Sequence, residues 1–261
     1  RLVSDWSSDV SSSDLVVSRP VRGPVSRTVV RLGARSLFGR WRGVLLFVLP
    51  LVLVGLAVLV RALVGEDQDS AEAVVYNLGL AVVVPLVALL ATSGLLASEI
   101  DDGSIAYLLA KPVSRYTIVS SKLVVALGSV LAFGAVPMGM AGLVLLPGSP
   151  SFALGFFLAS LLGGAAYCAV FSWLSVLTRH AVVIGLIYLL IWEGLLGGLL
   201  DGIRWLSITR WSSEVVDWVA STELVDDLPL TYALIALVGV FVLGVRGTAR
   251  RLQGFNLTGD E

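Results

Sequence analysis

The feature that most constrains this chain is a series of six long apolar runs, at residues 43–64, 74–97, 119–146, 152–177, 181–200 and 228–245. A helix needs about 20 apolar residues to cross roughly 30 Å of hydrocarbon. Lipid offers the backbone no hydrogen-bond partners, so such runs must satisfy their own polar groups as helices. The chain is 57% hydrophobic and 14% charged, whereas soluble domains are about 25% charged. The sequence therefore predicts an all-α, polytopic membrane protein with six transmembrane helices.

The basic residues predict the orientation. If the N-terminus is cytoplasmic, three of the 18 Lys and Arg residues lie outside, Arg61, Arg204 and Arg210, and the others lie inside. This excess of basic residues inside agrees with the positive-inside rule. An even number of spans then puts both termini in the cytoplasm. Because the charges are spread along the chain, no patch for nucleic acid is predicted. Arginine far outnumbers lysine beside abundant alanine, valine and glycine, which indicates a GC-rich bacterial source and hence a bacterial plasma membrane.

Outside the runs, the chain divides into shorter parts. Residues 1–15 resemble a translated sequencing adapter, so we exclude them from fold reasoning and expect the natural chain to begin near Val16. Residues 16–42 form a cytoplasmic entry segment in which 25–41 alternate arginines with apolar residues, as in a basic amphipathic helix lying on the inner leaflet. The six-span transmembrane domain covers 43–245, and 246–261 form a cytoplasmic tail.

The polar stretch 201–228 is predicted to lie outside. Ile208, Trp211, Val215 and Trp218 recur at helical spacing, and tryptophans concentrate at the membrane–water boundary. We expect an outer interfacial helix, or a re-entrant hairpin, between the fifth and sixth spans. An ordinary hydrated loop is the alternative, because several acidic residues share the stretch.

Glu193 is the acidic residue well inside a span, and an intramembrane carboxylate is costly and by default a functional hypothesis. It has two interpretations, an intramembrane charge on a substrate path or a side chain hydrated near the outer surface. Gly194, Gly198 and Gly202 follow at four-residue spacing, which favours close packing with another helix. Pro85 and Pro137 lie inside spans as bend points or static kinks.

Several chemistries find no support. Neither Lys111 nor Lys122, the two lysines, follows a glycine, so the chain lacks a G-x-x-x-x-G-K-[ST] phosphate loop. Cys168 and His180 are single residues of their types, which makes a zinc site improbable. A membrane hydrolase would have to use Ser93 with His180; a packing serine and a loop histidine are the favoured interpretation.

The segment 97–122 carries the most specific motif. Asp101, Asp102 and Ser104 can cap a short helix, and Pro112 disfavours helix at Lys111. The pattern Glu99-x-x-x-Gly103-Ser104-Ile105-x-x-Leu108-Leu109-x-Lys111-Pro112-Val113-Ser114-Arg115 resembles the first cytoplasmic loop of type-2 ATP-binding-cassette exporter permeases.

The resemblance implies that two permease subunits pair in the bilayer and that each docks on a separate cytoplasmic ATPase, which binds ATP and Mg²⁺. No cofactor is expected in this chain. The short cytoplasmic helix between spans 2 and 3 would be the coupling helix, with Arg115 and Lys122 at phospholipid headgroup level. The implied coupling residues are Glu99, Gly103, Ser104, Ile105, Tyr107, Leu108, Leu109 and Arg115.

The sequence thus predicts a transport subunit without its own ATPase site, which couples ATP hydrolysis in its partner to outward movement of an unknown substrate. Two other functions stay open. One is a non-transporting scaffold or sensor that tethers an ATPase through the same loop. The other is a secondary transporter that uses Glu193.

Overall fold

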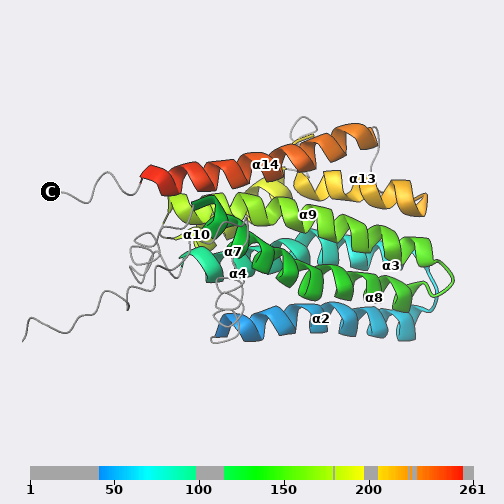
Figure 1. The fold of residues 1–261 in the computed structure, drawn as a ribbon. Coiled ribbons are helices and arrows are strands. Elements are labelled where there is room, and N and C mark those ends of the chain that lie inside the picture. The colour runs from blue at the N-terminus through cyan, green and yellow to red at the C-terminus, as the bar shows by residue number, and fades with distance from the viewer. Residues whose placement is uncertain are drawn as a thin grey trace, which may run out of the picture.

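The computed structural model describes residues 41–97, 115–178, 180–196, 205–222, 224 and 228–254. Every regular element in these ranges is helical (Figure 1). The predicted entry helix at 25–41, apart from Trp41, and the predicted coupling helix lie outside the described residues. In chain order, with η marking π-helical segments, the elements are α2 (Trp41–Val64), α3 (Gln68–Ala73), η1 (Val74–Val83), α4 (Val84–Thr92), η2 (Ser93–Ala97), α7 (Arg115–Val130), η3 (Leu131–Ala135), α8 (Val136–Leu145), α9 (Pro150–Leu177), α10 (Ala181–Tyr188), η4 (Leu189–Leu196), α13 (Ile208–Ala220) and α14 (Leu230–Gly254).

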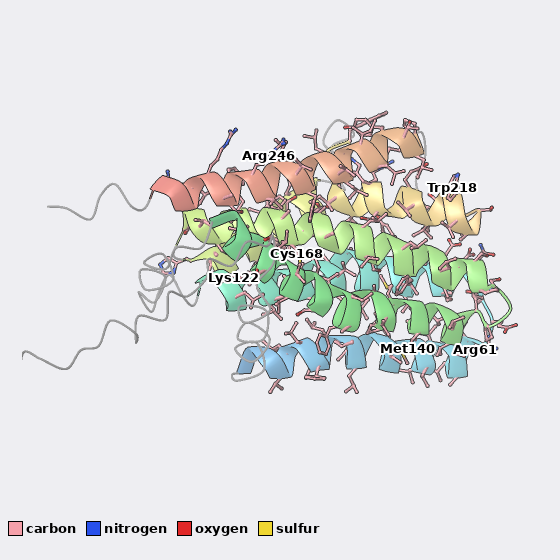
Figure 2. All side chains as sticks on the ribbon, viewed as in Figure 1. Arg61, Lys122, Met140, Cys168, Trp218 and Arg246 are labelled. Atoms are coloured by element: carbon pink, nitrogen blue, oxygen red, sulfur yellow. The ribbon has the colours of Figure 1, made fainter. Side chains whose placement is uncertain are left out.

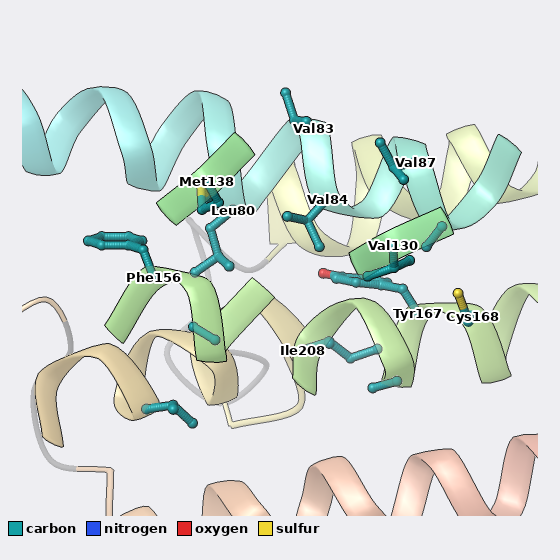
Figure 3. Packing of buried hydrophobic residues seen from close by; sticks show 14 of the residues in the cluster. Leu80, Val83, Val84, Val87, Val130, Met138, Phe156, Tyr167, Cys168 and Ile208 are labelled. Carbon is teal, nitrogen blue, oxygen red and sulfur yellow. The ribbon is translucent and has the colours of Figure 1, made fainter. Parts of the chain in front are cut away.

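The helices form a bundle around α9. Five helical stretches in the described part of the chain are long and apolar enough to cross a membrane, and Ala181–Leu195 is a shorter apolar helix. In the most apolar window of α9, 61% of the residues are buried, against 28% in α2 and 17% in α14. Tyr167, Phe156 and Phe171 of α9 are fully buried, and Figure 3 shows Tyr167 and Phe156 among the side chains of the core. The predicted all-α, polytopic membrane fold is confirmed.

The two ends of the bundle differ in charge. At one end, here called the basic end, α2 begins and α14 finishes; Lys122 and Arg246 lie near it, whereas Arg61 and Trp218 lie near the other end (Figure 2). We call the opposite end the acidic end, after the residues of its first turn, Glu66, Asp67, Asp69 and Glu72. Trp41 and Gly254 share the basic end, as an even number of crossings requires.

A tight turn at the acidic end joins α2 to α3. Gly65 has a φ of 88°, a conformation that glycine adopts without steric cost. Asp67 caps α3 by accepting a hydrogen bond from the Ser70 amide at 2.9 Å. The hydrogen bonds from the side chain and backbone of Ser70 lower the pKa of Asp67 below its usual value. Arg61 pairs with Glu66 at 2.7 Å, which fixes the end of α2 against the turn.

Two spans contain a π-helical segment directly before a proline. Pro85 is near the start of α4 and follows η1, and Pro137 is near the start of α8 and follows η3. The Val84 amide donates to the Gly79 carbonyl, and the Val136 amide donates to the Leu131 carbonyl, both five residues back. Proline lacks an amide hydrogen and its ring clashes with the carbonyl four residues earlier. The wider π-helical turn before each proline makes room for its ring and tolerates the missing amide hydrogen, so each proline marks a local change of helix type.

The fifth crossing departs from the prediction. Of the expected span at 181–200, residues 181–196 are described and form α10 and η4. Ser207 and Ile208 at the start of α13 bond to Glu193 of η4. The Thr209 and Tyr167 hydroxyls lie 2.8 Å apart, and Tyr167 is about 25 Å along α9 from Pro150 and about 15 Å from Leu177. Helix α13 therefore begins near mid-depth and continues from η4 toward the acidic end. Two helices, not one, make this crossing.

The predicted helix at 208–218 is observed as α13, and its apolar stripe faces other helices of the bundle. Ile208, Trp211 and Val215 are buried, and α13 lies along α9 and α14 inside the bundle (Figure 1). A Cβ added at Gly155 of α9 would lie 3.3 Å from the Cα of Val216, so the two helices are in close contact. Small residues on α9 admit α13 to the bundle, and its apolar stripe packs there instead of on lipid headgroups.

Lys122 also differs from expectation. The resemblance placed it at phospholipid headgroup level, but its side chain is 3% exposed and its Nζ donates to the Leu95 carbonyl at 2.9 Å. Carbonyls at a helix C-terminus have no partner within the helix and carry partial negative charge. Lys122 thus joins the start of the third span to the end of the second.

We expect Lys122→Met to lower the free energy of unfolding by about 1–2 kcal/mol, because the buried Leu95 carbonyl loses a charged donor. Equilibrium unfolding in detergent micelles measures this loss. Arg246→Met is the control, since Arg246 is exposed near the same end of the bundle. Equal stability of the Lys122 variant and the wild type would contradict the prediction.

Candidate functional site

A cavity of about 480 Å³ opens between η1 and α4 on one side and α10, η4 and α13 on the other. Six of its lining residues are polar: Tyr76, Asn77, Glu193, Ser207, Thr209 and Arg210. Six are aliphatic: Ala81, Val82, Leu86, Leu186, Leu189 and Leu190; Gly194 completes the wall. A mostly apolar hollow with a few convergent polar groups, in the range of about 300–1,000 Å³, is typical of small-molecule sites.

Glu193 occupies the junction of the two-part crossing. Its carboxylate accepts hydrogen bonds from the Ser207 hydroxyl at 2.5 Å, from the Ile208 amide at 3.0 Å and from the Tyr188 hydroxyl at 3.4 Å. The first amides of a helix lack partners within the helix, and the positive end of its dipole attracts an anion. The start of α13 thereby offsets the free-energy cost of holding the Glu193 carboxylate in a half-buried position.

Ser207 is the N-cap residue of α13, and Glu193 adds a further acceptor at the same helix start. The Arg210 amide donates to its side-chain oxygen at 3.2 Å, the usual bond of an N-cap serine. The Ser207 hydroxyl gives its own hydrogen to Glu193, so the serine connects the carboxylate to the first turn of the helix. This turn carries Thr209 and Arg210 to the cavity wall.

Aromatic side chains hold η4 in place against α9. The rings of Tyr167 and Phe171 stack with centroids 5.8 Å apart, Tyr188 meets Phe171 edge-on at 6.2 Å, and Trp192 stacks on Tyr188 at 6.5 Å. The Trp192 indole also donates to the Leu206 carbonyl at 3.4 Å. These ring contacts connect α10 and η4, the helical stretch that carries Glu193, to α9.

The residues predicted for function fall into two groups. Glu193 and Gly194 line the cavity, whereas Gly198 and Gly202 lie outside the described residues. A Cβ added to Gly194 would meet no atom of another helix within 4 Å; close helix contacts are made at other glycines, such as Gly142 and Gly244. Seven of the predicted coupling residues, Glu99, Gly103, Ser104, Ile105, Tyr107, Leu108 and Leu109, also lie outside the described residues. Arg115 is the first residue of α7.

The positions of Ser93 and His180 do not support the membrane-hydrolase hypothesis. Ser93 is fully buried and its hydroxyl donates to the Leu90 carbonyl of its own helix at 3.3 Å. His180 is exposed, and its backbone amide donates to the Thr178 hydroxyl. A nucleophile and its base must be within hydrogen-bond reach, and these side chains lie in different environments.

Sequence reasoning missed the other polar residues of the cavity wall. Ser207 precedes a helical apolar stripe, which is an N-cap signal, and Asn77 is a polar residue inside an apolar run, which signals a functional position in a membrane helix. Thr209 and Arg210 carry no such local signal. Their place beside Glu193 follows from the packing of α13 on α9.

The family model described as "ABC-2 family transporter protein" matches residues 28–251 of this chain. The matched region contains the 97–122 motif, Glu193 and every described helix, with α14 included up to Arg251. A search of curated proteins finds no match to the sequence.

Proposed function

This chain belongs to the ABC-2 transporter family, and from that premise we propose that it is the permease subunit of an exporter driven by a separate cytoplasmic ATPase. The family match over residues 28–251 is the observation that carries the proposal. The chain is a membrane permease of an ABC-type transporter; the outward direction, the coupling to ATP hydrolysis and the pairing with a second permease subunit belong to the proposal.

The ATPase would dock at the basic end. The segment 98–114 joins η2 to α7, and both of these flanking elements lie at that end of the bundle (Figure 1). The excess of Lys and Arg supports a cytoplasmic basic end. The sequence has no G-x-x-x-x-G-K-[ST] phosphate-binding loop of its own. This agrees with a partner chain that binds and hydrolyses the nucleotide.

Substitution in the predicted coupling segment tests the proposal. We expect Glu99→Ala with Leu108→Arg to abolish co-purification with the ATPase and transport-coupled hydrolysis in proteoliposomes, because an anchoring carboxylate and an apolar docking residue are both lost. Gln68→Arg with Asp69→Ala is the charge-matched control, since both residues are exposed on α3 at the acidic end. The proposal fails if the coupling variant keeps both association and coupled hydrolysis.

Proton-driven transport is a second candidate, and one observation favours it: Glu193 is a carboxylate in the wall of a cavity near mid-depth. Its three hydrogen-bond donors give it a structural role that needs no proton transfer. Transport that requires a pH gradient, proceeds without ATP and is lost in Glu193→Gln would favour this function over the ATP-driven one.

A further inference from the structure

The walls of the cavity change from polar to apolar along the bundle axis. On η1 and α4, Tyr76 and Asn77 come first from the acidic end, and Val82 and Leu86 follow toward the basic end. On the opposite wall, Leu186 of α10 is nearer the basic end than Glu193 of η4. We propose that the cavity binds a single-chain amphiphile with its polar headgroup toward the acidic end and its hydrocarbon tail toward the basic end.

The polar half presents groups that can both donate and accept hydrogen bonds. The Asn77 amide nitrogen donates to the Ala73 carbonyl at 2.9 Å, which orients the side chain while its oxygen can still accept. Thr209 and Arg210 reach the same half of the cavity from α13. The Thr209 hydroxyl lies 2.8 Å from the Tyr167 hydroxyl, so it can take part in a headgroup contact without giving up that neighbour. A headgroup with both a donor and an acceptor matches this polar wall, whereas a pure hydrocarbon would remove water from the wall and offer no hydrogen bonds in its place.

The apolar half continues onto the outer surface of the bundle. Val82 is 41% exposed, Leu186 44% and Leu190 74%, and all three line the cavity. Exposed leucine and valine inside membrane helices adjoin lipid, so a tail can enter from the hydrocarbon phase without crossing water. A polyhydroxylated ligand would instead bury hydroxyl groups against leucines without partners, which is costly.

The volume favours one chain over two. About 480 Å³ lies in the lower half of the range of small-molecule sites, about 300–1,000 Å³. Glu193 also fits a headgroup site without needing to bind the headgroup, because its carboxylate already accepts three hydrogen bonds from Tyr188, Ser207 and Ile208. As a transport substrate the amphiphile rests on the proposed function, but its binding does not require ATP, an ATPase or movement across the membrane.

Photo-cross-linking in lipid nanodiscs tests the binding and its polarity. The probe is a dodecyl phosphoethanolamine, whose ammonium donates and whose phosphate accepts hydrogen bonds, with a diazirine either at the end of the tail or beside the headgroup. Adducts are located by mass spectrometry. We expect the tail diazirine to label Leu86 or Leu186 and the headgroup diazirine to label Asn77 or Thr209. An excess of unlabelled dodecyl phosphoethanolamine should suppress these adducts at least fivefold, and phosphoethanolamine without a tail should not. Reversed labelling, or equal labelling of α2 that competitor does not reduce, would overturn the proposal.

Matched variants separate cavity binding from contact with bulk lipid. Gly194 and Gly55 are both exposed glycines inside membrane helices, and an added Cβ meets no other helix within 4 Å at either position. Gly194→Trp fills the cavity and should reduce specific labelling at least tenfold, whereas Gly55→Trp on α2 should leave it within twofold.

A second pair guards against misfolding of the tryptophan variant. Leu190→Asp places a charge in the apolar half and should also reduce labelling tenfold; Ile235→Asp is its control, with 72% exposure on α14 against 74% for Leu190. Unchanged labelling in both cavity variants would overturn the inference. Because the assay contains no ATP or ATPase, labelling that behaves as expected while the Glu99 and Leu108 test fails would refute the proposed function alone.

Discussion

Gly244→Leu is expected to destabilise the bundle by about 3 kcal/mol, the upper end of the usual cost of overpacking. An added Cβ at this position would lie 2.7 Å from the carbonyl carbon and oxygen of Ala169 and 2.9 Å from its Cβ. Two of these three atoms belong to the backbone of α9, the central helix, and cannot move aside as a flexible side chain does. The substitution therefore forces α14 away from α9. Equilibrium unfolding in detergent micelles measures the loss.

A glycine on the same helix supplies the control. An added Cβ at Gly239 meets nothing within 4 Å, so Gly239→Leu should change the free energy of unfolding by less than about 0.5 kcal/mol. Gly244→Ala is informative as well, because the clash begins at the Cβ itself. If Gly244→Leu and Gly239→Leu have the same stability, α14 does not pack on α9 at this contact.

Glu193→Leu should lower the free energy of unfolding by about 2–3 kcal/mol, since the Ser207 hydroxyl, the Ile208 amide and the Tyr188 hydroxyl lose their shared acceptor. The loss should be local first. Amide hydrogen exchange at Ile208 should become faster, because this amide donates to Glu193 at 3.0 Å in the native structure. Exchange within α2, on the other side of the bundle, should stay the same.

Graded variants distinguish the charge from the hydrogen bonds. Glu193→Gln keeps one acceptor oxygen and should lose less stability than Glu193→Leu, and Ser207→Ala should cost about 1 kcal/mol as the loss of an N-cap. Asp69→Asn, on the exposed helix α3, is the control for removing a carboxylate. Full stability of Glu193→Leu, with unchanged exchange at Ile208, would show that the carboxylate does not hold the start of α13.

The membrane-crossing helices could be predicted because they depend on local composition. An apolar run of sufficient length must be helical in lipid wherever its neighbours lie, and the positions of the first four spans follow from this alone. Helix α13 could not be placed in the same way. Its stripe of Ile208, Trp211 and Val215 suits a membrane surface and a helical neighbour equally, and Glu214 and Asp217 favoured water. What decides is the facing row of small residues on α9, such as Gly155 and Gly163.

The site was predictable in part for a similar reason. Glu193 draws attention because a carboxylate inside a span is costly, but what offsets its cost is the start of a helix 14 residues later in the chain. No local pattern connects the two. The coupling residues from Glu99 to Leu109 remain a prediction of the sequence motif, since they lie outside the described residues.

The two parts of the fifth crossing are attached to the bundle in different ways. Helix α13 is fastened to its neighbours by the Tyr167–Thr209 contact and by the Tyr232 hydroxyl, which donates to the Trp205 carbonyl at 3.0 Å. Helix α10 instead packs through the ring of Tyr188, which meets Phe171 of α9 edge-on at 6.2 Å, and through Gly185, where an added Cβ would lie 2.5 Å from a methyl group of Leu89. The half of the crossing nearer the basic end is therefore attached by close apolar and aromatic packing, whereas hydrogen bonds hold the half nearer the acidic end.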